Sequence, residues 1–291
     1  MTQELNRRGF LQAAIATTAL MGMAGAAKAA TPKPKLKKAI KFSMVSTKDS
    51  MLDKFKMVKE IGFEGVEFDS PNGFKLEDVL SARDQTGLVI HGVIDSVHWR
   101  DTLSHPDEKI RTKGRNALLT ALQDAHNYGA DTALLVPGVV NKEVSYEQCW
   151  DRSQTEIKKV LPEAEKLGVK IAIEVVWNNF ITKPEQLIEY VDSFKSPFVG
   201  AYFDCSNMIK FGVKSGDWIR QLGQRMLKFD FKGYHKTKGW VPIGEGDEDW
   251  PDVLKALEEI GYNGWATSEV GGGGREHLTK VYKQMQDVLG G

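Results

Sequence analysis

Acidic side chains recur near the ends of short apolar, β-rich segments in this 291-residue sequence. These acids are Glu67, Asp69, Glu174, Asp204, Asp230 and Glu269. Carboxylates that are buried together repel one another and take up protons unless a cation lies among them. If the fold gathers these residues, a divalent metal ion is the simplest explanation for them. An all-oxygen ligand set favours a hard ion, so we expect one divalent metal such as Mn²⁺ or Mg²⁺.

The histidines offer no competing zinc site. They lie at positions 91, 98, 105, 126, 235 and 277, and they form no H-x-x-x-H or Cys-His pattern. Zinc prefers histidine and cysteine ligands at closely defined spacings. A zinc cluster is therefore not expected.

Eight β-rich segments must position the acids, and helix-like segments separate them. The expected strands are residues 39–45, 65–68, 88–94, 132–136, 169–176, 198–203, 226–231 and 265–270. Glycines with the character of C-terminal helix caps follow several helix-like segments, for example Gly129 and Gly168. Strands that alternate with helices pair in parallel through right-handed crossovers. Eight such units in roughly 250 residues predict an α/β fold, a single (β/α)8 TIM barrel.

A doubly wound open sheet is the alternative architecture. It fits less well because no G-x-G-x-x-G motif follows the first expected strand. In a closed barrel, functional residues lie at the carboxyl ends of the strands. Glu174, Asp204, Asp230 and Glu269 belong to four successive strands, so their side chains should meet at one mouth. Any one of them could instead cap a following helix, and Asp204 is the clearest case.

The first 29 residues have the features of an export signal. Arg7-Arg8 precede an apolar run over residues 11–27, and Ala27-Lys28-Ala29 offers the small residues that a signal peptidase accepts. The arginine pair with the following Gly-Phe-Leu resembles the twin-arginine motif, whose pathway exports folded proteins from the bacterial cytoplasm. We therefore predict a twin-arginine-type signal peptide at residues 1–29 and a periplasmic mature protein. An uncleaved membrane anchor is the alternative, although the run is short for a membrane span.

Two further segments complete the expected domain organisation. Residues 30–38 form a basic, proline-punctuated leader that we expect to be a solvated tail. Residues 39–291 form the TIM-barrel catalytic domain, because no long linker or break in composition divides them.

The composition excludes several classes of function. The chain has 39 Lys and Arg residues against 39 Asp and Glu residues, whereas proteins that bind nucleic acids or membrane surfaces need a basic excess. Two cysteines cannot cross-link a chain of this size, which is long enough to fold by apolar packing alone. We expect neither a nucleic-acid partner nor stable membrane insertion after signal cleavage, and the sequence specifies no oligomeric state.

Five short motifs follow one another along the expected barrel. They are Gly65-Val66-Glu67-Phe68, Ile171-Ala172-Ile173-Glu174, residues 199–207 (VGAYFDCSN), residues 243–247 (IGEGD) with Trp250, and residues 261–265 (GYNGW) with Glu269. Together they resemble the xylose-isomerase-like sugar phosphate isomerase/epimerase family, from about Ile40 to the C-terminus. The resemblance implies a TIM barrel with one divalent metal, commonly manganese, held by a glutamate, an aspartate, a histidine and a glutamate on strands five to eight. We therefore expect Mn²⁺ first, with Mg²⁺ or Co²⁺ as alternatives. In this chain those positions are Glu174, Asp204, Asp230 and Glu269.

Two positions depart from the family pattern. The family usually has His-x-Lys-Asp on strand seven, where this chain has Asp230-Phe231-Lys232-Gly233. Either Asp230 makes the metal site more anionic, or His235 folds back to replace the missing histidine. Asn207 stands where a histidine is frequent in the family, so it can bind substrate but cannot act as an acid or base.

The resemblance also implies a reaction on a small-molecule carbohydrate. In the epimerases of the family, two glutamates flank the carbon next to a carbonyl that the metal polarises, and one removes a proton while the other returns it from the opposite face. Glu174 and Glu269 would be this catalytic pair. The residues expected to bind substrate are Glu67, His98, Trp99, Trp177, Asn207, Lys232 and His235. The alternative for Trp99 and Trp177 is that they pack against neighbouring loops.

Three functions are consistent with these features. The first is a metal-dependent sugar isomerase or epimerase, and export would favour a free sugar, keto-sugar or glycoside over a cytoplasmic sugar phosphate. The second is a lyase or hydratase that acts on 3-keto-sugars or 3-keto-glycosides at the same metal site. The third is a catalytically silent sugar-binding protein, because Asp230 replaces the usual histidine.

Overall fold

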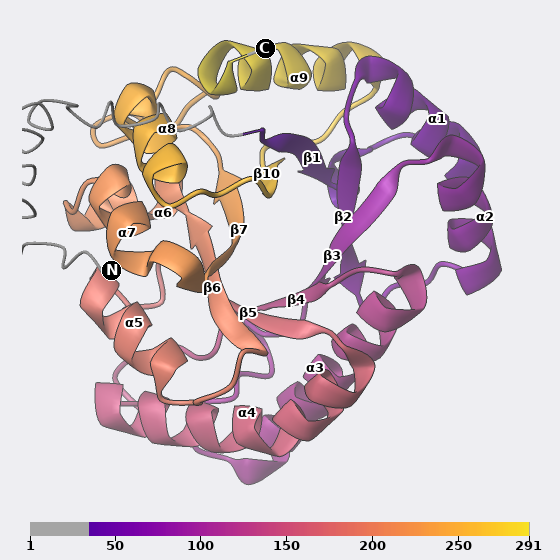
Figure 1. Cartoon of the computed structure of the whole chain (residues 1–291). Coiled ribbons are helices and arrows are strands. Elements are labelled where there is room, and N and C mark those ends of the chain that lie inside the picture. The colour runs from indigo at the N-terminus through magenta and orange to yellow at the C-terminus, as the bar shows by residue number, and fades with distance from the viewer. Residues whose placement is uncertain (1–34, 291) are drawn as a thin grey trace, which may run out of the picture. The chain divides into compact units, whose positions relative to one another are not determined.

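The computed structural model describes residues 35–290, which build a closed barrel of parallel strands inside a ring of helices (Figure 1). Around the barrel the strands follow the order β1-β10-β7-β6-β5-β4-β3-β2, and every neighbouring pair is parallel. The barrel strands are β1 Lys37–Lys41, β2 Gly65–Ser70, β3 Val89–Asp95, β4 Thr132–Leu135, β5 Lys170–Glu174, β6 Val199–Asp204, β7 Met226–Phe231 and β10 Trp265–Ser268. The predicted (β/α)8 TIM barrel is confirmed, and the open sheet is excluded.

Helices follow the strands along the chain and cover the outside of the barrel (Figure 1). The last helix packs beside the first, which closes the outer ring. Within residues 35–290, no helix has the length and apolar character needed to cross a membrane. The helices are α1 Met51–Ile61, α2 Leu76–Thr86, α3 Glu108–Tyr128, α4 Tyr146–Leu167, α5 Pro184–Asp192, α6 Cys205–Met208, α7 Ser215–Leu222, α8 Trp250–Glu259 and α9 Arg275–Leu289.

The local sequence explains where helix α4 begins and ends. The Ser145 hydroxyl accepts a hydrogen bond from the Gln148 backbone N–H, and the Gln148 side chain accepts one from the Ser145 N–H, which is a capping box. Apolar residues such as Ile157 and Val160 recur every three or four positions on the buried face. Gly168 ends the helix with a φ of 69°, a left-handed conformation that glycine adopts without strain.

The ends of the barrel differ from the expected boundaries. Residues 39–45 were expected to form the first strand, but β1 begins at Lys37 and ends at Lys41, and Phe42–Met44 form a 3₁₀ turn. The backbones of Lys37 and Lys38 pair with β10, so these two residues belong to the barrel and not to a solvated leader. The predicted signal peptide and residues 30–34 lie outside the described residues.

An unexpected antiparallel hairpin follows β7. Its strands are β8 Tyr234–His235 and β9 Gly239–Trp240. The Trp240 ring stacks on Trp177, with 5.1 Å between the ring centroids. The hairpin therefore adds an aromatic side chain beside the residues that follow β5.

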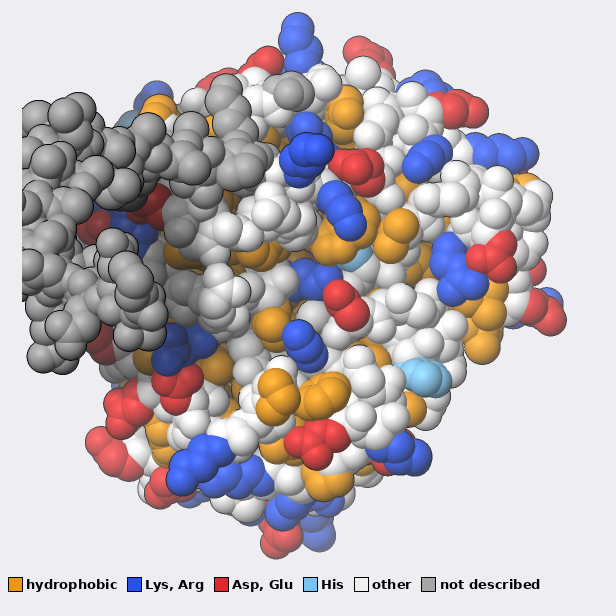
Figure 2. Space-filling model, viewed as in Figure 1, with side chains coloured by type: hydrophobic (Ala, Val, Ile, Leu, Met, Phe, Trp, Pro, Cys, Tyr) orange, Lys and Arg blue, Asp and Glu red, His pale blue; other side chains and the backbone are white. Residues whose placement is uncertain are grey.

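The surface carries both signs of charge. In the view of Figure 2, Lys and Arg side chains are interspersed with Asp and Glu side chains over the visible part of residues 35–290. This mixture agrees with the equal numbers of acidic and basic residues in the chain.

Candidate active site

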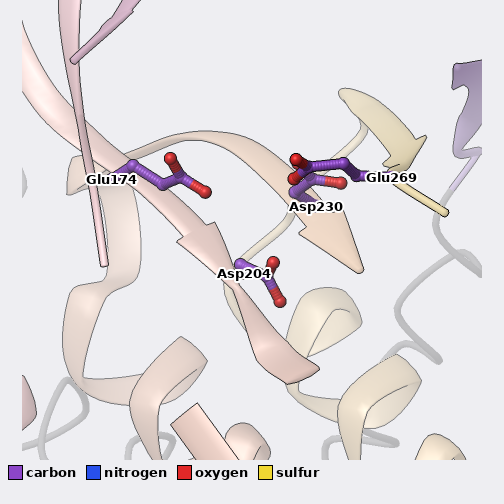
Figure 3. Close-up of side chains that lie close together, drawn as sticks. All are labelled: Glu174, Asp204, Asp230 and Glu269. Atoms are coloured by element: carbon purple, nitrogen blue, oxygen red, sulfur yellow. The ribbon is translucent and has the colours of Figure 1, made fainter. Parts of the chain in front are cut away.

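Four carboxylates meet at the carboxyl end of the barrel. Glu174 and Asp204 are the last residues of β5 and β6, Asp230 is the penultimate residue of β7, and Glu269 directly follows β10. One carboxylate oxygen of each lies within 4.8 Å of the corresponding oxygens of the others. Figure 3 shows the four side chains around a common space. Parallel strands that end at the same edge thus gather residues that are far apart in the sequence, as expected.

Asp204 both caps a helix and belongs to the carboxylate cluster. Its Oδ1 accepts hydrogen bonds from the backbone N–H groups of Ser206 and Asn207 at 2.8 and 2.9 Å, which caps α6. Its Oδ2 lies 2.5 Å from the Lys232 ammonium. Asp204 thus caps a helix and contributes to the cluster, because the two cap hydrogen bonds occupy only Oδ1.

Asp230 is fully buried and retains one oxygen without a hydrogen bond. Its Oδ1 accepts from the Phe231 N–H at 2.8 Å. Its Oδ2 lies 2.9 Å from the Lys41 ammonium, at an angle unsuited to a hydrogen bond. Burial raises the pKa of Asp230 to about 7, although the charges of Lys41 and Lys232 act in the opposite direction.

A buried lysine connects Asp230 to the interior of the barrel. The Lys41 ammonium lies 2.5 Å from Glu67 Oε2 and donates to the Tyr202 hydroxyl at 3.2 Å. Tyr202 in turn donates to Glu67 Oε2 at 2.9 Å. Burial lowers the pKa of Lys41, but the charges of Asp230 and Glu67 outweigh it and raise the pKa well above its ordinary value. Lys41 is therefore a permanent cation at the base of the site.

Two residues expected to bind substrate do not line the site. Glu67 is fully buried below the mouth, because it lies in the middle of β2 and points into the barrel towards Lys41. The hairpin carries His235 away from the cluster, so that its Nε2 lies 3.7 Å from Asp247 Oδ1 and its Nδ1 accepts from the Thr237 N–H. Asp230, and not His235, completes the set of four potential ligands.

The environments of the two glutamates shift their pKa values in opposite directions. Burial and the negative charge of Glu269 raise the pKa of Glu174 well above its usual range, and Lys232 offsets this only in part. Burial also acts to raise the pKa of Glu269, but Lys232, with its ammonium 2.8 Å away, and Lys41 outweigh it and lower the pKa. Two acids whose pKa values diverge can serve as a general acid and a general base.

An inner cavity of about 240 Å³ opens above the cluster. Its lining includes Glu174, Glu269 and Lys41 together with residues from several loops. Trp240 also lines the cavity, and it was not among the residues predicted from the sequence. The one signal for it in the sequence is an aromatic side chain in the connection after strand seven. Five of the residues expected to bind substrate line this cavity, namely His98, Trp99, Trp177, Asn207 and Lys232.

Aromatic side chains form one wall of the inner cavity. Trp177 donates from Nε1 to the Asn207 carbonyl at 2.7 Å, and its ring contacts both Trp240 and the Lys210 ammonium. Trp177 therefore packs against its neighbours as well as lining the cavity. Trp240 and Trp99 are 50% and 51% exposed, so their rings have free surface for a ligand.

His98 is a neutral group in this wall. It is buried, and its Nδ1 accepts from the Val136 N–H at 3.3 Å. Burial lowers the pKa of His98 to about 4. The ring can therefore offer a hydrogen bond to a ligand without adding charge.

The donor set fits a hard divalent ion. All four potential ligands are carboxylate oxygens, and these oxygens lie within 4.8 Å of one another. A metal ion with bonds of about 2.1 Å holds opposite ligands about 4.2 Å apart, so the spacing of these oxygens suits such an ion. Oδ2 of Asp230 has no hydrogen bond, but it lies 2.9 Å from the Lys41 ammonium, which competes with a metal ion for this oxygen. The Lys232 ammonium contacts Asp204 and Glu269, so it competes with a cation for these oxygens.

Comparisons with known proteins agree with this geometry. The model of the xylose isomerase-like TIM barrel family matches residues 55–289. The L-ribulose-5-phosphate 3-epimerase UlaE of Salmonella heidelberg is 24% identical over 234 residues, which cover 73% of this chain and 79% of that protein.

Two solved structures share the fold. The IOLI protein with a binding zinc atom has a TM-score of 0.75 at 18% identity, over 87% of this chain and 98% of that one. The 3-keto-D-glucoside 4-epimerase YcjR of E. coli has a TM-score of 0.73 at 15% identity, over 87% and 99%. The family match extends over most of the described barrel, and its strand ends carry the acidic cluster. This chain belongs to the xylose isomerase-like TIM barrel family.

Proposed function

We propose that this protein is a divalent-metal-dependent epimerase or isomerase of a keto-sugar or a related carbohydrate. The observation that carries the proposal is the pair Glu174 and Glu269, whose carboxylates face each other across the cluster of four acids (Figure 3). The similarity to sugar epimerases, UlaE among them, supports the same class of reaction.

The two glutamates divide the proton transfers. In its ionised form Glu269 removes the proton from the carbon next to the carbonyl, and the electron pair of the broken C–H bond moves into an enediolate of the sugar. Glu174, in its protonated form, returns a proton to the opposite face of that carbon. The side chain of Glu269 is 44% exposed, so its acquired proton can exchange with solvent.

A metal ion would be held by Glu174, Asp204, Asp230 and Glu269. When bound, such an ion supplies a Lewis acid that polarises the carbonyl and stabilises the negative charge of the enediolate by several kcal/mol. The all-oxygen set favours Mn²⁺ in this chain, with Mg²⁺ or Co²⁺ as alternatives, whereas the related IOLI protein contains zinc.

Other side chains would orient the sugar. The free surfaces of Trp99 and Trp240 suit the apolar faces of a sugar ring. Asn207 and Lys232 line the cavity with hydrogen-bond donors for hydroxyl groups, and Lys232 lies next to both Asp204 and Glu269. Lys232 would therefore bind an oxygen of the substrate close to the reacting carbon.

Incubation with keto-sugars and 3-keto-glycosides in D₂O, with Mn²⁺ added, tests this function. The proposal expects deuterium at the carbon next to the carbonyl and formation of an epimer or isomer. An unsaturated or hydrated product would instead support the lyase or hydratase hypothesis, and tight binding without exchange would support a silent sugar-binding protein. Glu77→Gln, an exposed residue of α2, is the matched control for substitutions of the two glutamates.

We also propose that residues 1–29 are a twin-arginine-type signal peptide and that the mature protein is periplasmic. Arg7-Arg8, the apolar run at 11–27 and the small residues around Lys28 support this proposal. In that compartment a free sugar or a glycoside is a more suitable substrate than a sugar phosphate.

A further inference from the structure

A second, larger cavity lies beside the inner one. Its volume is about 530 Å³, compared with about 240 Å³ for the inner cavity. Lys232, Trp240 and Glu269 line both cavities, so the two spaces meet at these side chains. A molecule that reacts at Glu269 can therefore extend from one cavity into the other.

The volumes suggest a substrate with two parts. Small-molecule sites in proteins are typically roughly 300–1,000 Å³ in volume. The inner cavity is below this range and the outer cavity is well within it. A single sugar ring at the catalytic glutamates would leave the outer cavity without a ligand.

The lining of the outer cavity is mainly apolar. Its walls include the buried side chains of Ile243 and Val281. Further apolar surface comes from Val241, Pro242 and Val270. These residues come from the connection after β9, the segment after β10 and helix α9. A second sugar ring would lose hydrogen bonds to water against such a surface, whereas an apolar group gains free energy by being buried there.

The polar groups at the edge of the outer cavity do not form an anion site. His277 has its Nε2 2.7 Å from the Gly271 carbonyl, so this nitrogen already has a partner. Lys280 is exposed to solvent, and the Lys232 ammonium is held beside Asp204 and Glu269, where the proposed function assigns it to the reacting ring. The half-exposed ring of Trp240 stands where the two cavities meet, and aromatic surface of this kind suits a planar ligand group.

We propose that the outer cavity binds the aglycone of a glycoside, an apolar or aromatic group attached to the keto-sugar whose ring lies in the inner cavity. This inference rests on the proposed function, because it places the reacting ring at Glu174 and Glu269. The substrate class is then an aryl or similarly apolar keto-glycoside. Trp240 contacts both the ring and the aglycone of this substrate.

Two matched probes test the inference, the phenyl and the methyl glycosides of the same keto-sugar. Their kcat/KM values are measured with the full chain in the presence of Mn²⁺ by deuterium exchange, and their affinities by titration calorimetry. Wild-type protein should prefer the phenyl glycoside by about tenfold or more, because its ring buries additional apolar surface.

Substitutions at the wall of the outer cavity complete the test. Gln284→Trp on α9 fills the cavity, and the phenyl-to-methyl ratio should then fall towards one. Val241→Trp fills it from the other side and serves if the first variant does not fold. Lys283→Trp, an exposed neighbour on α9 that lines neither cavity, should leave the ratio at its wild-type value.

The outcomes separate the inference from the proposed function. Tighter binding of the phenyl glycoside that Gln284→Trp abolishes, without any deuterium exchange, would support the outer cavity and refute the proposed catalysis. Equal turnover of both probes, unchanged in Gln284→Trp and Val241→Trp, would overturn the inference while leaving the catalysis intact. Failure of both probes to bind would overturn the inference as well.

Discussion

Removal of the Lys41 ammonium should destabilise the barrel strongly. Lys41 is 3% exposed and lies 2.5 Å from Glu67 Oε2 and 2.9 Å from Asp230 Oδ2. The substitution Lys41→Met keeps most of the length of the side chain and removes its charge. Glu67 and Asp230 would then be buried carboxylates without their shared cation.

The size of the effect follows from these contacts. Breaking a buried ion pair by removing one partner costs about 3–5 kcal/mol, because the other charge stays buried without compensation. Asp230 contributes less to this loss of stability than a permanently charged group would, because a carboxyl with a pKa of about 7 takes up a proton near neutral pH. Glu67 would still lose a partner at 2.5 Å. We expect a loss of about 3–5 kcal/mol, a large part of the about 5–15 kcal/mol that stabilises a typical protein.

Urea denaturation followed by circular dichroism, with a chelator present, measures this loss. Lys56→Met, at an exposed position on α1, is the control and should change the free energy of unfolding by less than about 0.5 kcal/mol. The double variant Lys41→Met/Glu67→Met removes both members of the closest pair and should recover most of the loss. A loss below about 1 kcal/mol in Lys41→Met, or no recovery in the double variant, would show that the buried ion pair does not stabilise the fold.

Four other predictions concern function. Glu174→Gln and Glu269→Gln should each lower turnover by about 10²- to 10⁴-fold at saturating Mn²⁺, and full activity in either would exclude that residue as acid or base. Elemental analysis of protein purified without chelator should find about one equivalent of a divalent metal; less than about a tenth, with no activation by added Mn²⁺, contradicts the metal site. Lys232→Met should bind Mn²⁺ more tightly than wild type in a calorimetric titration, because the ammonium competes for Asp204 and Glu269; weaker or equal affinity argues against this competition. Replacement of Arg7 and Arg8 by lysine should leave the precursor in the cytoplasm, as judged by cell fractionation, and normal export of that variant would rule out the twin-arginine pathway.

The architecture was predictable because its signals are local. Apolar β-rich runs alternate with helix-like segments along the chain, and each expected strand contains or overlaps an observed one. The error at β1 has a physical cause. Residues 42–45 are as apolar as a strand, but a strand ends where its neighbours stop pairing with it, and β1 pairs with β10 and β2 only as far as Lys41.

The carboxylate cluster was also predictable, because it depends on topology more than on detailed packing. Parallel strands of a barrel end at one edge, so acids at the ends of β5, β6, β7 and β10 meet without any further information. The residue types at these positions then indicate an oxygen-ligand site. The same logic could not show that Asp204 uses one oxygen for the helix and the other for Lys232.

Only the tertiary structure decided how the charges of the site are balanced and where its walls stand. Lys41 on β1 reaches Asp230 on β7 across the barrel interior, and Glu67 points below the mouth, because strand register sets the height of each side chain along the barrel axis. The hairpin after β7 carries His235 away from the cluster and brings Trp240 to the junction of the two cavities. Residue types and their spacing along the chain specify which groups are present at the mouth of the barrel. Which of these groups meet is determined by distant strands and loops, because contacts across the barrel depend on strand register and loop geometry that no local pattern contains.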